Sequence, residues 1–191
     1  NNLNVVPDIA ETWTVSTDKK AYTFKIRNGI YFHESEFFEN GQSRNVNAYD
    51  FEYSFNRLMD SDVASPGAWV MNNVESFEAI NDSIFEIHLD NEFNSFLEIL
   101  TMKYCSVVPK EVVQSLGNSF SKKPIGTGPF KFKRWDENIK LVLVKNENYH
   151  EFDQSGKRLP YLDAISTRFI PDKKSEFMEF MSGNLDMINS P

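Results

Sequence analysis

Short segments in which apolar and polar residues alternate are the feature that most constrains this fold. Tyr22, Phe24 and Ile26 alternate with polar neighbours, which is the two-residue period of a strand with one buried face. Asn28-Gly29 follows, a pair typical of two-residue turns, so we expect residues 30–32 to return as the partner strand. The alternation therefore predicts an antiparallel hairpin early in the chain.

Similar patterns recur further along the sequence. One pair of alternating segments flanks the turn at 81–83, and another flanks the turn at 136–138. A single strand and a final extended segment complete the set. The strands expected from these patterns are 74–80, 84–89, 130–135, 139–144 and 165–170, with an extended segment at 185–188.

Helices are predicted where apolar residues follow a spacing of three and four. Asn47 is a good N-cap with Asp50 three residues later, and it precedes the apolar face Phe51, Phe55, Leu58 and Met59. Shorter helices are expected at 93–100, after Pro109 up to Gly117, and after Asp172 up to Gly183, the last carrying Phe177, Phe180 and Met181. Hairpins mixed with helices predict a mixed α/β or α+β fold.

Charge, hydropathy and cysteine content exclude several classes of protein. The net charge is −8 and the 20 Lys and Arg are scattered, so a nucleic-acid partner is not expected. The sequence has no run of 18 apolar residues, and its start resembles the middle of a longer protein. The single cysteine, Cys105, leaves no partner for an internal disulfide and is expected to be a small buried hydrophobe.

The segment Gly126-Thr127-Gly128 raises the question of a phosphate-binding loop. Such loops present backbone N–H groups at the start of a helix. Here Pro129 removes one N–H donor, and the alternating residues after it predict a strand. We therefore interpret the segment as a tight corner in which glycine supplies unusual φ angles.

The remaining polar residues show no catalytic pattern. Acidic pairs such as Glu34 and Glu36 carry no signature, and no G-x-S-x-G nucleophile elbow is present. His33 beside Glu34 and Glu36 is a poor metal site because loop neighbours rarely converge on one ion. His88 falls on the polar side of its strand. We expect no enzyme activity, cofactor or metal.

Six motifs, in order, carry a resemblance to a known family. The chain resembles family 5 extracellular solute-binding proteins, the oligopeptide, dipeptide and nickel receptors of ABC importers. The matching segments are "PDIAETW…YTFKIRNGIYFHE", "VNAYDFEYSF", "ASPGAW", "VVPKEVV", "PIGTGPFKF…VLVKNENYHE" and "PYLDAISTRFIPDKKSEFMEFMSGNLDMINSP".

The resemblance implies a fold, a function and a location. It implies part of lobe one of a type II periplasmic-binding-protein-like fold, with residues 1–121 as its smaller subdomain and 122–191 as part of its principal subdomain. The second lobe is expected to be absent, so the chain alone is expected to bind little. The implied protein is a periplasmic or extracytoplasmic, lipid-anchored monomer that captures a solute, above all a peptide, and delivers it to an ABC permease.

The resemblance also implies candidate ligand-binding residues. Peptide-binding relatives carry a ligand-facing aromatic residue after Ser-Pro in the A-S-P-x-A loop, whereas this chain has Gly67 there and Trp69 two residues later. Trp69 is equally consistent with a lid over the core, and Asn189 with an exposed polar end. The candidates are Ser65, Pro66, Gly67, Trp69, Asn189 and Ser190.

One alternative function stays open at this point. Phe supplies 17 residues of the chain, which is a large share of its aromatic content. If those rings form an exposed face, a structural or protein-interaction domain is the second hypothesis. The identity of the solute is not indicated by the sequence.

Overall fold

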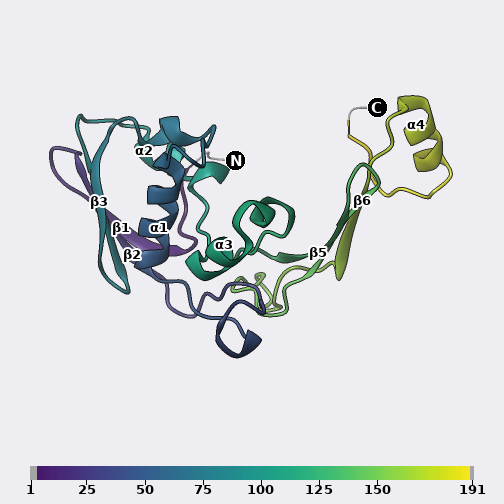
Figure 1. Cartoon of the computed structure of the whole chain (residues 1–191), viewed down its shortest axis with the longest axis horizontal. Coiled ribbons are helices and arrows are strands. Elements are labelled where there is room, and N and C mark those ends of the chain that lie inside the picture. The colour runs from purple at the N-terminus through teal and green to yellow at the C-terminus, as the bar shows by residue number, and fades with distance from the viewer. Residues whose placement is uncertain (1–3, 190–191) are drawn as a thin grey trace.

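A computed structural model describes residues 4–189. Figure 1 shows two parts arranged along the long axis of the molecule. We call residues 4–122 the body, residues 130–189 the arm, and residues 123–129 the joining segment. The body holds one sheet with helices packed against it, and the arm holds a second sheet that projects away from the body (Figure 1).

The body sheet has four antiparallel strands in the order β1-β2-β4-β3. The hairpin predicted around 81–83 is confirmed, with Phe77 opposite Ile87. Alternate residues of β2 and β4 are buried, as their sequence period predicted. The strands are β1 (Ala10–Val15), β2 (Ala21–Ile26), β3 (Val74–Asn81) and β4 (Ile84–Leu89).

The hairpin predicted at Asn28-Gly29 is wrong. The chain does turn there, and Gly29 takes the left-handed φ of +82°. However, β2 lies between β1 and β4, so neither of its edges is open to residues 30–32. That segment pairs with 44–46 instead, through Phe32 N–H to Arg44 O at 3.1 Å and Val46 N–H to Ile30 O at 2.8 Å. The true hairpin partner of β2 is β1, which was not predicted from the sequence.

Helix α1 (Ala48–Met59) begins and packs largely as its sequence predicts. The Asn47 side chain accepts the Asp50 N–H, and the Asp50 side chain accepts the Asn47 N–H, which completes a capping box. Phe55 and Leu58 are buried against the sheet. Met59 is 47% exposed, so its assignment to the buried face is wrong.

The other helices are short. Pro109 and Gly117 flank α3, and the Asp172 side chain caps α4 by accepting the Ser175 N–H at 2.7 Å. None of the described helices is long and apolar enough to cross a membrane. The remaining α-helices are α2 (Phe96–Leu100), α3 (Lys110–Leu116) and α4 (Lys173–Met181), and the 3₁₀ helices are η1 (Glu39–Gly41), η2 (Ala68–Met71), η3 (Lys103–Cys105) and η4 (Gly117–Lys122).

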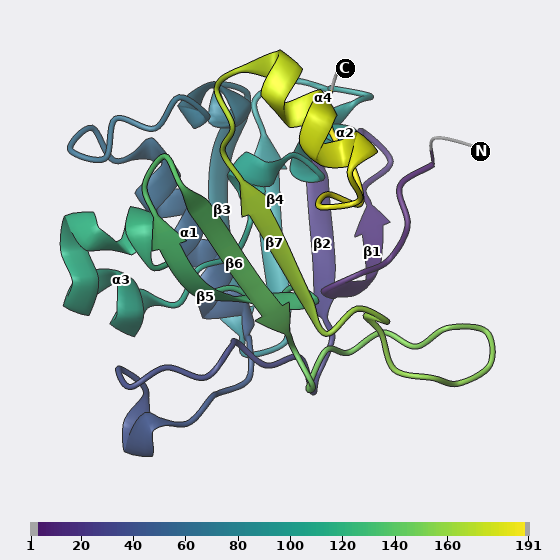
Figure 2. The same ribbon diagram turned by 90° about the vertical axis from the view of Figure 1, so that its right-hand side faces the viewer.

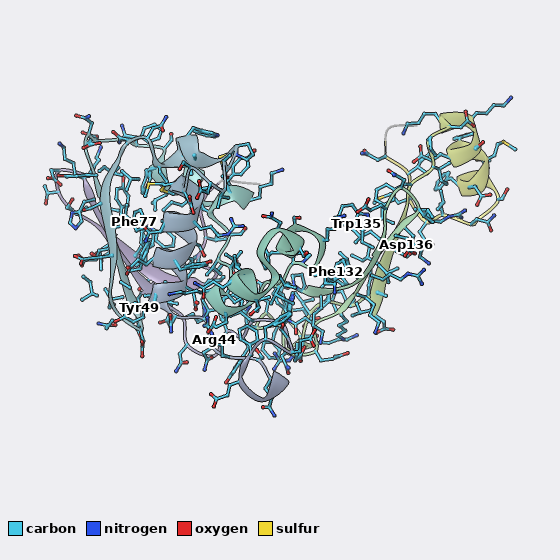
Figure 3. All side chains as sticks on the ribbon, viewed as in Figure 1. Arg44, Tyr49, Phe77, Phe132, Trp135 and Asp136 are labelled. Atoms are coloured by element: carbon cyan, nitrogen blue, oxygen red, sulfur yellow. The ribbon has the colours of Figure 1, made fainter. Side chains whose placement is uncertain are left out.

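Arg44 connects three segments at the base of the body, next to the joining segment (Figure 3). Its guanidinium donates two hydrogen bonds to Asp50 on α1, at 2.7 and 2.8 Å, and two to Glu111 on α3, at the same distances. The group also lies over the Phe32 ring, 5.1 Å from its centroid. Phe32 belongs to a second core, separate from the one under α1, built from Ile30, Phe32, Phe38, Val46, Val107 and Val112.

The ion pairs of Glu111 and Glu34 predict that the protein loses stability in acid. The hydrogen bond from Arg44 lowers the pKa of Glu111 below its ordinary value of 4.5, and that from Lys131 does the same for Glu34. A pKa lowered by folding stabilises the protein above the unfolded value, and that contribution disappears as the pH falls through the folded value. The urea midpoint should therefore decrease below about pH 4.5. Glu111→Gln should flatten the decrease, and Glu75→Gln, an exposed carboxylate on β3, should leave it unchanged.

The arm is an antiparallel sheet in the order β5-β6-β7, with α4 beyond one end (Figure 2). The strands are β5 (Phe130–Asp136), β6 (Lys140–Lys145) and β7 (Ala164–Arg168). Between residues 130 and 189, only Asn146 and Pro160 are buried. The exposed large apolar side chains there are Trp135, Ile139, Phe152, Tyr161, Leu162, Phe169, Phe177, Met178, Phe180, Met181 and Met187.

Candidate ligand-binding surface

The predicted loop 65–69 packs against an aromatic ring from another segment. The Ser65 hydroxyl accepts the Gly67 N–H at 3.2 Å, which sets the turn, and Gly67 is buried. A Cβ atom at Gly67 would lie only 2.4 to 2.6 Å from carbon atoms of Tyr104. Tyr104 therefore fills the space that a side chain at position 67 would need.

This arrangement accounts for the departure at Gly67. Tyr104 was not predicted from the sequence, and the only hint was the glycine at position 67, which leaves room beside the loop. Trp69, at the start of η2, keeps 47% of its surface exposed, and Pro66 is exposed as well. The loop thus offers an exposed indole ring on a rigid turn.

The other candidate residues belong to the arm. Asn189 is exposed, and its carbonyl oxygen accepts a hydrogen bond from the Lys173 ammonium on α4 at 3.3 Å. Ser190 lies outside the described residues. The loop 65–69 is part of the body, whereas α4 stands at the opposite end of the long axis (Figure 1). The two groups of candidates therefore lie on either side of the joining segment and are not brought together by the described residues.

A largely apolar hollow of about 940 Å³ lies where the body meets the joining segment. Side chains of the body sheet, α1 and α2 line it together with the backbone of Gly126-Thr127-Gly128. Of the described residues, the predicted candidates are not among those lining it. Periodicity assigned several of these side chains to buried faces, so no sequence pattern indicated the hollow. Representative lining residues are Trp13, Phe24, Phe51, Ile87, Leu100 and Met102.

The joining segment is held by hydrogen bonds to its carbonyl groups. The Gly126 carbonyl accepts the backbone N–H of His33 at 2.8 Å. The Gly128 carbonyl accepts from His33 Nε2 at 2.9 Å and from the Asn146 amide at 3.0 Å. Burial lowers the pKa of His33, which favours the neutral imidazole. His33 therefore positions the corner.

One part of the corner interpretation is correct and another is wrong. The strand predicted after Pro129 is present as β5, and no helix begins there, so a phosphate cradle is not formed. However, neither Gly126 nor Gly128 has a positive φ, and a Cβ atom on either would meet nothing within 4 Å. The segment turns by means of its carbonyl hydrogen bonds and does not need the conformational freedom of glycine.

Cys105 is a buried hydrophobe, as predicted. Burial raises the pKa of its thiol to about 11, so the thiolate is scarce at neutral pH. Its sulfur lies 3.7 Å from the Ile99 carbonyl, to which the thiol donates. This environment suits packing and does not activate a nucleophile.

Comparison with known proteins identifies the family. The model of bacterial extracellular solute-binding proteins, family 5 Middle, matches residues 4–191. The chain belongs to this family. Its members are substrate-binding proteins of transport systems, found in the periplasm or outside the cell.

Individual relatives agree with the family model. A probable di/tripeptide-binding protein 5 from Pseudomonas aeruginosa is 30% identical, over 98% of this chain and 37% of its own length. The periplasmic protein DppA from Helicobacter pylori, solved with the peptide STSA, is 30% identical with a TM-score of 0.82, over 94% of this chain and 36% of its own. HbpA2 from Haemophilus parasuis is 26% identical with a TM-score of 0.84, over 98% of this chain and 39% of its own. The chain thus spans little more than a third of these relatives.

Proposed function

We propose that this chain forms one side of the solute-binding cleft of an ABC-importer receptor. The solute is a peptide, and the receptor delivers it to a membrane permease as a lipid-anchored monomer outside the cytoplasm. The observation that carries the proposal is the likeness to the peptide-bound H. pylori DppA over 94% of this chain. The family membership supports this function over the interaction domain that the aromatic content left open.

A cleft with a second surface from outside this chain is inferred from the share of the relatives that the chain covers. Because the relatives are nearly three times as long, we infer that residues outside these 191 supply the second surface. A ligand gains affinity when it is desolvated between two surfaces, so one surface alone offers few contacts. Residues 1–121 and 122–191 are then two subdomains of one lobe, and loop 65–69 and residues 189–190 border the cleft. Catalysis has no role in this function.

A titration with a tetrapeptide such as STSA tests the proposal. The longer gene product should bind it, while the isolated 191 residues should show no binding in the micromolar range. Trp69→Ala in the longer product should weaken binding by about tenfold or more, because exposed aromatic anchors dominate such contacts. Trp135→Ala is the matched control, since Trp135 is 42% exposed but lies on β5. Micromolar capture by the 191 residues alone, or equal losses in both variants, would contradict the proposal.

A further inference from the structure

We propose that Asp8, His150 and Glu151 bind a divalent transition-metal ion such as Zn²⁺. One ligand atom from each of these residues lies within 4.8 Å of the others. Asp8 precedes β1 in the body, and His150 and Glu151 follow β6 in the arm, so the site joins segments 142 residues apart. From the sequence no metal was expected, because His33 with its loop neighbours and the single cysteine make poor sites, and no local pattern places residues 8 and 150–151 together.

The distances fit an ion that replaces a proton. His150 Nε2 and Asp8 Oδ1 are 2.9 Å apart and share one hydrogen. Two ligands that each lie about 2.1 Å from a tetrahedral Zn²⁺ are separated by about 3.4 Å. Exchange of the shared hydrogen for the ion therefore requires a movement of about half an ångström in this pair. The Glu151 carboxylate has to move further to complete three protein ligands.

Neighbouring groups hold the proposed ligands in place. The Tyr149 hydroxyl donates a hydrogen bond to Glu151 Oε2 at 2.9 Å. Arg27 Nε donates to the Asp8 carbonyl at 2.9 Å. The His150 side chain is only 13% exposed, and its ring packs edge-on against Tyr149 at 4.7 Å. Such outer contacts orient ligands in known metal sites.

The donor set indicates the class of metal. One imidazole nitrogen with two carboxylate oxygens suits Zn²⁺, Co²⁺, Ni²⁺ or Mn²⁺, whereas Ca²⁺ and Mg²⁺ prefer oxygen alone. The two carboxylate groups also place acidic oxygen atoms at the site, which a divalent cation can bind. His150 Nδ1 is buried without a hydrogen-bond partner among the described residues, so the ring can bind only through Nε2.

Calorimetric titration of ZnCl₂ into the tag-free 191-residue chain tests this inference. We expect one saturable site, and we expect Asp8→Asn and His150→Gln each to weaken Zn²⁺ binding by tenfold or more. Asp8 has a side chain 63% exposed, so Asp8→Asn should fold even if the His150 variant does not. His88→Gln is the matched control, because His88 lies on β4 with Glu86 Oε2 at 3.8 Å, outside the cluster.

The titration can also contradict the proposed metal site. Absence of saturable binding, an Asp8→Asn variant that binds like the parent chain, or a loss confined to His88→Gln would each overturn the site. Zn²⁺ should also raise the thermal midpoint of the parent chain and raise that of Asp8→Asn less at the same concentration, since the stabilisation depends on the affinity of the folded state. The inference does not rest on the proposed peptide capture, and Trp69 does not enter the test.

Discussion

Replacement of Arg44 by methionine should lower the free energy of unfolding by about 3–5 kcal/mol, as measured by urea titration. The loss arises because the Asp50 side chain is only 5% exposed, so its oxygen atoms would lose the two hydrogen bonds from Arg44 with little access to solvent. Methionine keeps a flexible apolar side chain but also removes the guanidinium over the Phe32 ring, so the variant tests all contacts of the charged group together. The second core and the start of α1 should both loosen.

Two companion variants separate the explanations. Arg44→Met combined with Asp50→Asn should recover part of the loss, because the buried charge disappears while the amide can still cap α1. Arg168→Met removes an arginine paired with Glu179 at 2.9 Å, but 45% of its side chain is exposed, so it should cost no more than about 1 kcal/mol. An Arg44→Met loss as small as that of Arg168→Met would show that the network adds little.

Gly67→Ala should destabilise the body by about 1–3 kcal/mol, which is typical of an overpacked site. The added methyl group would lie 2.4 Å from Tyr104 Cγ, well inside contact distance. The ring must therefore move, and the loop that carries Trp69 should lose its fixed geometry. Thermal unfolding, followed by tryptophan fluorescence in a background that carries Trp13→Phe and Trp135→Phe so that Trp69 alone is left, measures both effects.

A double-mutant cycle identifies the cause of this effect. In a Tyr104→Ala background the added methyl group has room, so Gly67→Ala should cost much less there than in the parent chain. Gly126→Ala is the control, because a methyl group at position 126 would meet nothing within 4 Å and the φ of Gly126 is ordinary. Equal costs in both backgrounds would mean that the Tyr104 ring is not the obstacle.

Local signals in the sequence predicted most of the elements. The capping pair Asn47 and Asp50, the turn at 81–83 and the turn at 136–138 all act over a few residues, so the chain reveals them directly. The error at Asn28-Gly29 has a different origin. That dipeptide favours a turn, but the competition of β1 and β4 for the edges of β2 decides which strands pair. Strand pairing depends on residues far apart in the sequence, so a short stretch of sequence does not reveal which strands pair.

The candidate site was predictable to a smaller extent. Motif resemblance indicated the loop at Gly67, but it could not show that Tyr104, 37 positions later, fills the space beside it. Likewise, no local pattern brings Asp8 next to His150. The role of Gly126 and Gly128 was misjudged because composition alone does not distinguish a left-handed glycine from one bonded through its carbonyl group. Each of these features depends on contacts between segments that are distant in the sequence, which is why it was not predicted.

The carbonyl oxygen of Gly128 has a mechanical consequence. It accepts hydrogen bonds from His33, in the body, and from Asn146, in the arm, so both parts are hydrogen-bonded to the same atom. A swing of the arm must pivot close to this oxygen or break one of its two bonds. A rotation of the arm about that oxygen would be amplified over the length of the arm and would change the separation of α4 from Trp69.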